Sequence, residues 1–561
     1  MIGVMKMNIN LNLHKGFADC INKMVKKYGE KFSLMNGFSN SNLNFTDFID
    51  NFIKSSSVAD TTIDANANST TLDVRTLLSD MVKPHTKLLS YNKIFGELSA
   101  KYGLELAEKW LEGEWNGQFY LHNSSTASFI PYCYAYDLDK LVENGLFFIN
   151  KFKTAPCQHL TTFNDHVLEF ISWTANRSSG AVGLPSYLLY SYYFWYNDVK
   201  NNFFLKDPEY YRRQCFQKFI YDLNQPYLRV TECAFSNITV MDRNYLIELF
   251  GGRQFPNGDL VMDHIEQIIE HQKVFMEVVS EIREETMMTF PVLTYSLLFQ
   301  DGKFVDEEFA RWCNKHNMKW YDSNFYVGSD VSSLSNCCRL ISNTSKLNAF
   351  INSVGGTSLS IGSVQVNTIN LRRIAIEAEG SKEKFIEILK NRIDICVKVL
   401  DVVRDIIKQN IKEGLLPNYT SGLIELSKQY NTIGITAMYE ALYEFGLIDT
   451  DEFENKSYSP EGLEFASEIL SVINEQKESY GFDYSINVEA VPAERANVVL
   501  SGKDAELYPE KEQYFIYSNQ WIPLMEKCTL NEKIKLGAKL DKECGGGQIS
   551  HINLAGKFAN E

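Results

Sequence analysis

The chain has 561 residues, with 71 acidic and 55 basic side chains and a formal net charge of −16. Its composition, 45% apolar and 22% charged residues, is that of a globular protein and excludes a disordered chain. The acidic balance argues against general nucleic-acid binding, which rests on Lys and Arg surfaces that neutralise phosphates. A local basic pocket for a small phosphorylated ligand stays compatible with it. The length fits three to four domains or one large barrel with additions.

The sequence carries no recognisable membrane or export signal. Its most apolar run, residues 187–196, is too short to span a bilayer, and the N-terminus lacks a continuous apolar segment with a cleavage site. The 11 cysteines are scattered without a CxxC pair, which is unlike a disulfide framework or a four-cysteine zinc site. We therefore expect a cytoplasmic protein.

In chain order, residues 1–71 are expected to form a polar, weakly structured lead-in, with a linker-like run at 55–71. From residue 72 the apolar residues recur at helical spacing. Along 91–112 they mark one face of a single helix. The apolar residues of this face are Ile94, Leu98, Tyr102, Leu106 and Trp110.

The rest of the chain alternates between two kinds of element. Long helices are expected at 161–175, 259–285, 380–412 and 460–478. Short strands are expected at 228–231, 237–240, 290–294, 364–370 and 497–500. This alternation predicts an α/β fold with parallel strand pairing, organised as one catalytic domain over 72–561.

The adjacent cysteines Cys337 and Cys338 follow a run of Ser, Asn and Asp, which predicts a loop tip or a loop–strand junction. Two buried, inert thiols and one accessible, reactive thiol are equally compatible with that placement. Cys133 lies between tyrosines and is most simply a core residue. Nothing local makes it a nucleophile.

Two segments have the composition of anion-binding sites. The glycine- and serine-rich run at 355–363 lacks the features of a phosphate-binding P-loop, and a tight turn is the simpler interpretation. The sequence Pro-Ala-Glu-Arg-Ala at 492–496 can open a helix whose free N–H groups hold phosphate, or can open a helix without a ligand. Cys544 and the glycines at 545–547 predict a flexible turn. The histidines show no metal-ligand spacing, so no metal is assigned.

Several longer runs match one family in the right order. They are HLTTFNDHVLEFISWTANRSSGAVGLPS (159–186), TFPVLTYSL (289–297), SNCCRL (335–340), GTSLSIGSVQVNTINLRRIA (356–375), NVEAVPAERANVV (487–499), YSNQWIPL (517–524) and GGGQISHINL (545–554). Together they resemble the anaerobic (class III, glycyl-radical) ribonucleoside-triphosphate reductase large subunit. The run YCYAYDL around Cys133 resembles the phage-type branch.

The resemblance implies a ten-stranded α/β barrel with a helical N-terminal region and a finger loop threading the barrel. Cys337 or Cys338, with Cys337 favoured, would carry the thiyl radical that abstracts the 3′-hydrogen of a ribonucleoside triphosphate. Cys133 would be the second active-site cysteine, with formate as the reductant. Ala493, Glu494, Arg495 and Ala496 would bind the substrate phosphates, in agreement with the free N–H groups of a helix start.

The resemblance also implies partners. These are a radical S-adenosylmethionine activase with an iron–sulfur cluster, a second copy of the chain, and deoxynucleotide effectors that act through helices like those at 72–112. Control of substrate choice is expected. The polar lead-in at 1–71 is too short for a complete ATP cone of the kind found in the family, so overall on/off control by ATP and dATP is not expected. No bound cofactor, nucleic acid or membrane is expected.

The sequence departs from the family after the HINL run. It has neither an RVxGY-like radical motif nor the paired cysteines of the family's zinc module, so we assign no radical glycine. One hypothesis is a split reductase whose radical glycine comes from a separate polypeptide. The others are a silent nucleotide-binding subunit, a sequence that is part of a longer chain, and a relative of pyruvate formate-lyase.

Overall fold

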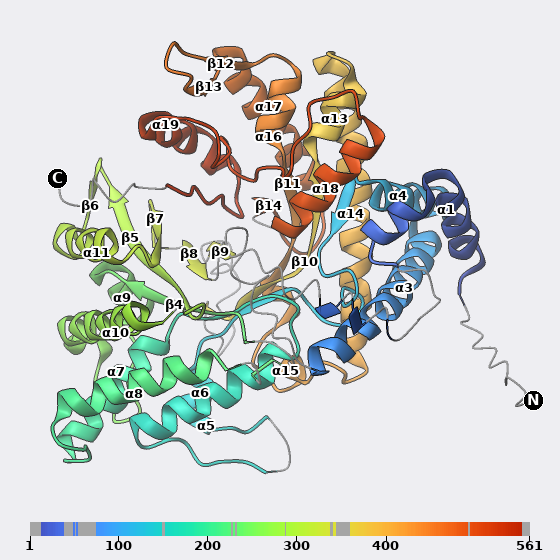
Figure 1. Ribbon diagram of the computed structural model, residues 1–561. Helices are drawn as coiled ribbons and strands as arrows, with labels where there is room; N and C mark the ends of the chain where they lie inside the picture. The colour runs from blue at the N-terminus through green and yellow to red at the C-terminus, as the bar shows by residue number, and fades with distance from the viewer. Residues whose placement is uncertain are drawn as a thin grey trace, which may run out of the picture.

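The computed structural model describes residues 13–38, 46, 49–50, 52–53, 74–148, 152–225, 228–229, 233–286, 288–331, 333–336, 340–343, 359–491 and 494–552. A ten-stranded sheet runs through the middle of the molecule, and helices cover it on the outside (Figure 1). The strands of this sheet are β1 (Phe119–Leu121), β2 (Cys133–Ala135), β3 (Val182–Leu184), β4 (Ser236–Met241), β5 (Val292–Gln300), β6 (Lys303–Phe304), β7 (Ser323–Gly328), β10 (Ile361–Asn370), β11 (Gln429–Thr436) and β14 (Ile486–Ala490).

The sheet has two halves with parallel strands in each. The first half is β2, β3, β4, β5 and β7, and the second is β10, β11 and β14. The halves meet where β2 pairs antiparallel with β10, with Cys133 opposite Ser363. β4, β10 and β11 are buried along their whole length, as expected for parallel strands covered on both faces.

A hairpin lies between the two halves (Figure 1). It consists of β8 (Ser333–Asn336) and β9 (Leu340–Asn343), which pair antiparallel with Asn336 opposite Leu340. β8 contacts β4, β5 and β7 of the first half, whereas β9 contacts β10 of the second. The hairpin therefore bridges the two halves from within. A further two-stranded sheet, β12 (Ile448–Thr450) with β13 (Lys456–Tyr458), stands apart from the main sheet.

The helices form three groups. The N-terminal group is α1 (Lys15–Met35), α3 (Val74–Tyr102) and α4 (Leu104–Asn116). The helices of the first half are α5 (Asp139–Asn144), α6 (Leu160–Ala175), α7 (Tyr187–Lys200), α8 (Pro208–Leu223), α9 (Arg243–Phe250), η1 (Val261–His264), α10 (Ile265–Glu285) and α11 (Glu307–Trp320). Those of the second half are α13 (Leu371–Ala378), α14 (Lys382–Lys412), α15 (Pro417–Thr420), η2 (Leu426–Lys428), α16 (Met438–Glu444), α17 (Pro460–Glu478), α18 (Glu494–Leu507), α19 (Leu530–Leu540) and η3 (Asp541–Glu543).

The four long helices predicted from the sequence are present as α6, η1 with α10, α14 and α17. Their starts follow from local chemistry. Ser459 caps α17 by accepting the Gly462 N–H, and Pro460 occupies the first helical turn, where it needs no N–H partner. Ser381 caps α14 in the same way. These signals are strong because cap and periodicity agree.

Three sequence expectations need correction. Residues 15–35, expected to be weakly structured, form α1, which buries Phe17, Cys20, Met24 and Phe32 on one face. The single helix expected over 91–112 is broken at Gly103, whose φ of 96° no helix allows. The strand expected at 497–500 is instead part of α18. The β-branched valines favour a strand, but a short apolar run does not distinguish a strand from a buried helix.

The other predicted strands match β4, β5 and β10. Of the strand expected at 228–231, only residues 228–229 are described, and they belong to no named strand. Cys337, Cys338, Ala493 and residues 355–358 lie outside the described residues.

Candidate active site

Cys133 lies in β2, at the junction of the two sheet halves, and is 5% exposed. Its Sγ accepts a hydrogen bond from the Ala181 N–H over 3.2 Å. A small cluster of Ala181, Tyr430, Tyr132 and Phe235 surrounds it, separate from the main core. The thiol is thus fixed by the strand on one side and by the turn before β3 on the other.

Glycine is needed next to this thiol. A Cβ on Gly180 would lie 2.3 Å from Cys133 Sγ and 2.8 Å from the Tyr132 carbonyl oxygen. On the other neighbouring strand, a Cβ on Gly362 would lie 2.4 Å from the Cys133 carbonyl oxygen. All three distances are shorter than an ordinary Cβ contact, so the two glycines allow the strands to approach the cysteine closely.

In the sequence, Cys337 and Cys338 follow β8 and precede β9. Those two cysteines lie outside the described residues. The strands on either side of them are described: β9 contacts β10, and β10 pairs with β2, the strand that carries Cys133. That Cys133 and a cysteine of this segment act on one substrate stays a prediction.

The predicted phosphate-binding segment is at the start of α18. The helix begins at Glu494, directly after the stretch that follows β14. Arg495 is exposed, whereas Ala496 is 1% exposed and packs inward. The first turn of an α-helix has N–H groups without partners in the helix, so this end can hold an anion. The helix start predicted from the Pro-Ala-Glu-Arg-Ala run is confirmed, and phosphate binding there stays a prediction.

Asn497 ties this first turn to the second half of the sheet. Its Oδ1 accepts a hydrogen bond from the Thr436 hydroxyl at the end of β11, over 2.7 Å. Its carbonyl oxygen accepts the Tyr517 N–H, and the neighbouring Ser518 carbonyl accepts the Ala437 N–H. Ala437 has a φ of 63°, a left-handed conformation that turns the chain from β11 into α16. The YSNQW run thus acts as a clasp between β11 and α18.

A row of rings leads from α18 toward the cysteine. Tyr120 and His122 have ring centroids 5.1 Å apart, and His122 and Tyr132 have theirs 5.9 Å apart. His122 Nε2 lies 2.8 Å from the Thr368 hydroxyl. Burial lowers the pKa of His122 to about 3, so its ring is uncharged at neutral pH. Positive charge from Arg495 reaches Tyr120, where it opposes the rise in pKa that burial causes. The rings of Tyr120, His122 and Tyr132 therefore form a packed row that ends at the residue before Cys133.

The glycines at 545–547, predicted as a flexible turn, are docked on β14. The Gly546 N–H donates to the Val488 carbonyl over 2.8 Å, and Gly547 bridges in parallel to Glu489. Cys544 is 2% exposed, and burial raises the pKa of its thiol well above the usual range. This thiol is therefore a structural one.

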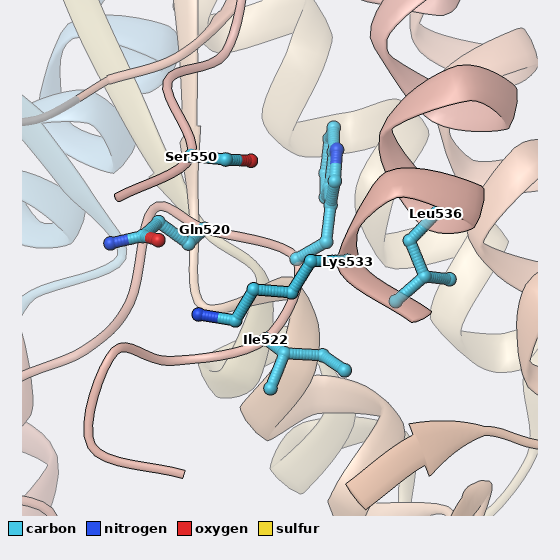
Figure 2. A pocket seen from close by; sticks show the side chains of 6 residues that line it. Gln520, Ile522, Lys533, Leu536 and Ser550 are labelled. Carbon is cyan, nitrogen blue, oxygen red and sulfur yellow. The ribbon is translucent and has the colours of Figure 1, made fainter. Parts of the chain in front are cut away.

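A small, partly open hollow lies between this segment, the YSNQW run and α19 (Figure 2). Gln520, Trp521, Ile522, Lys533, Leu536 and Ser550 line it. The labelled side chains in Figure 2 include the Lys533 ammonium and the Gln520 amide, which point to the same side of the hollow. Gln520 Oε1 also accepts the His551 N–H over 3.0 Å. The residues that line the hollow do not include Cys133 or Arg495.

The described residues contain no group of three or more His, Cys, Asp or Glu side chains arranged to hold a metal ion. None of the helices described combines the length and apolar character that crossing a membrane requires.

The sequence matches the family model described as anaerobic ribonucleoside-triphosphate reductase over residues 81–561. The chain belongs to this family. Among solved structures, the anaerobic ribonucleotide reductase from Thermotoga maritima in complex with dATP and CTP is 38% identical, with a TM-score of 0.88 over 99% of this chain and 89% of that one. The same enzyme with citrate in the active site is 38% identical, with a TM-score of 0.85 over 99% and 97%. Another anaerobic ribonucleotide reductase is 40% identical, with a TM-score of 0.87 over 98% and 85%.

No curated protein matches the chain. The reductase fold predicted from the resemblance, with its ten strands and helical N-terminal region, is confirmed by the structure and the relatives. Sequence reasoning missed Thr436 and Asn497, which lie on separate segments and meet only in the fold. It also missed the role of Gly180, although the run NRSSGAVGLP that contains this glycine was part of the family match.

Proposed function

We propose that the protein reduces ribonucleoside triphosphates to 2′-deoxyribonucleoside triphosphates under anaerobic conditions by thiyl-radical chemistry. The observation that carries the proposal is the meeting of two elements inside the sheet. The β8–β9 hairpin contacts both halves, and one of these contacts is with β10, the strand paired to Cys133. A radical cysteine on the hairpin and a second cysteine on β2 would then face one enclosed substrate.

The residue types suit this chemistry. A thiyl radical at Cys337, or at Cys338, takes a hydrogen atom from C3′, so that an S–H bond forms as a C–H bond breaks. The 2′-hydroxyl leaves as water, and formate is oxidised to carbon dioxide as it supplies two electrons. The hydrogen atom then returns to C3′ and restores the thiyl radical. Overall, ribonucleotide, formate and one proton give deoxyribonucleotide, carbon dioxide and water. Cys133 delivers reducing equivalents during loss of the hydroxyl.

The start of α18 would bind the triphosphate. We assign Ala493, Glu494, Arg495 and Ala496 to phosphate binding. In the described part of this segment, the first-turn N–H groups of α18, from Glu494 on, and the exposed side chain of Arg495 favour an anion. The Thermotoga maritima enzyme was solved with CTP and dATP, which supports nucleotide substrates and effectors here. We propose that deoxynucleotides select the substrate at a dimer interface formed by α3 and α4.

The starting radical is a glycyl radical made by a radical S-adenosylmethionine activase. The test is anaerobic incubation of the chain with activase, S-adenosylmethionine, formate and CTP, without and with an added polypeptide that carries an RVxGY motif. We expect dCTP to form in at least one arm, with carbon dioxide in equal amount. Absence of dCTP from both arms would overturn the proposal.

Single variants then assign the cysteines. Cys337→Ala and Cys133→Ala should each abolish turnover in the active arm, and Cys528→Ala, at a half-buried thiol elsewhere, should retain it. Full turnover in Cys337→Ala with none in Cys338→Ala would move the thiyl radical to Cys338. Turnover in the absence of formate would mean that a different reductant supplies the two electrons.

A further inference from the structure

The far end of α18 is anchored by a buried lysine. Lys503 is 1% exposed, and its Nζ donates hydrogen bonds to Asn36 Oδ1 and to the Glu114 carbonyl oxygen, each over 2.9 Å. Its aliphatic stem lies against Gly117, where a Cβ would come within 3.0 Å of the stem carbons. The side chain thus fills a narrow passage between α1 and α4.

Asn36 is the junction at the other end of this contact. It follows the last residue of α1, and its Nδ2 donates to the Phe32 carbonyl over 2.7 Å and to the Trp115 carbonyl over 2.9 Å. Its own carbonyl accepts the Lys87 ammonium from α3 over 2.6 Å. One asparagine therefore joins α1, α3 and α4 to Lys503.

The charges around Lys503 make this contact sensitive to loss. Glu114, Lys87, Arg373 and Asp504 face it from α4, α3, α13 and its own helix. Burial lowers the pKa of Lys503 and raises that of Glu114, so each charge is held at a cost in desolvation. A buried ammonium needs its acceptors, and Asn36 supplies one of the two.

Because α18 is one continuous helix, the contacts of Lys503 near its C-terminal end also restrict the position of its first turn. Lys503 and the first turn belong to one helix of 14 residues, and nine residues separate Lys503 from Glu494, about 13 Å of helix at 1.5 Å per residue. The hydrogen bond between Thr436 and Asn497 holds the first turn of α18 against β11. Lys503 holds the other end of the helix against the N-terminal helices. A shift of α1 would therefore displace the first turn.

We propose that Lys503 is a positioning residue for the substrate triphosphate: through Asn36 it couples helix α1 to the N-terminus of α18. This rests on the proposed role of that N-terminus in phosphate binding. It assigns to α1 a part in substrate affinity, although α1 is remote in sequence from the strands that carry the site.

The experiment is equilibrium binding of CTP to the full chain without activation, which separates affinity from radical chemistry. Lys503→Met keeps the stem and removes the ammonium. We expect it to weaken CTP binding about tenfold, within the range known for coupling residues that touch no ligand. Lys503→Arg keeps the charge and should restore part of the affinity. Lys31→Met is the matched control, because it breaks an exposed ion pair, Lys31 with Glu506, between the same two helices. It should change the affinity less than twofold.

Two further variants keep the test decisive. Asn36→Ala should weaken CTP binding. The double variant with Lys503→Met should bind CTP no more weakly than Lys503→Met alone, because the Lys503–Asn36 hydrogen bond is the contact that both substitutions remove. Additive losses would overturn the coupling. So would an unchanged CTP affinity in Lys503→Met, or, if that variant fails to fold, in Asn36→Ala.

A separate variant distinguishes the two proposals. Arg495→Glu places a negative charge at the helix start and should weaken CTP binding if phosphates bind there. If it has no effect, the proposed phosphate site fails. If it weakens binding and Lys503→Met does not, only the coupling fails.

Discussion

Thr436 donates its hydroxyl proton to Asn497 Oδ1 over 2.7 Å, and this bond joins the end of β11 to the first turn of α18. Both side chains are nearly fully buried, at 1% and 2% exposure. The start of the helix is therefore held by a sheet strand, which is more rigid than a loop. Such a fixed start suits the triphosphate site that we propose there.

Removing this hydroxyl should loosen the helix start. Thr436→Val keeps the shape and leaves Asn497 Oδ1 buried without that donor, which costs about 1–3 kcal/mol. We expect a lower free energy of unfolding in urea and weaker CTP binding. Thr450→Val, at an exposed position in β12, should change neither. Unchanged CTP affinity in Thr436→Val would contradict the clasp.

A methyl group at residue 180 should displace the Cys133 thiol. The Cβ of Gly180→Ala would lie 2.3 Å from Cys133 Sγ, so the cysteine or the turn before β3 must move. Because a displacement of about 1 Å at a reacting group costs on the order of 10²-fold in rate, we expect a loss of turnover of that size.

The control for this substitution is Gly252→Ala, where a Cβ meets nothing within 4 Å. It should retain full turnover in the same anaerobic assay. Equal turnover of Gly180→Ala and Gly252→Ala would show that the position of Cys133 does not limit the reaction.

Stability should fall with rising pH because of Glu440. This carboxyl is 1% exposed, its Oε1 accepts the Ser518 N–H over 2.8 Å, and its Oε2 has no hydrogen-bond partner among the described residues. Burial raises the pKa of Glu440 to about 7, above its ordinary value of 4.5. The contribution of the protonated Glu440 carboxyl to the unfolding free energy is complete below pH 4.5 and is lost as the pH rises through 7, because the unfolded state releases the proton at a lower pH than the folded state.

Glu440→Gln mimics the protonated carboxyl. Relative to the original chain, the variant should gain on the order of 2 kcal/mol in unfolding free energy at pH 8 and little at pH 5. Urea unfolding at the two pH values measures this. The exposed Glu452→Gln is the control. The same gain at both pH values would mean that Glu440 is ionised in the folded protein.

The buried ion pair of α18 should be costly to break. Arg373 pairs with Asp504, and the side chains are 2% and 1% exposed. Asp504 also accepts hydrogen bonds from Asn370 and Tyr517. Asp504→Ala leaves the guanidinium buried without its anion, so we expect a loss of about 3–5 kcal/mol in unfolding free energy. Glu506→Ala, two residues away in an exposed pair, should lose at most about 1 kcal/mol. Similar losses in the two variants would refute the distinction.

The sequence by itself determined the family and the elements with strong local signals. Helices α6, α14 and α17 were predictable because apolar residues recur at helical spacing over more than 15 residues. A Ser N-cap adds to this signal in α14 and α17, and Pro at the helix start adds to it in α17. The segments flanking the cysteines and the start of α18 were recognisable as runs of specific residues. These features are local, and the chain alone encodes them.

The tertiary structure decided what local signals could not. The valines at 498–499 favour a strand, yet they lie in a helix, in which Lys503 and Asp504 contact the buried partners Asn36 and Arg373. α1 is a 21-residue amphipathic helix, kinked at Gly29, whose buried face packs on α3 and α4, so its largely polar sequence did not reveal it. The contacts of Thr436 with Asn497 and of Asn36 with Lys503 join segments 61 and 467 residues apart. No periodicity or spacing encodes such pairs, because folding alone brings their hydrogen-bonding groups together.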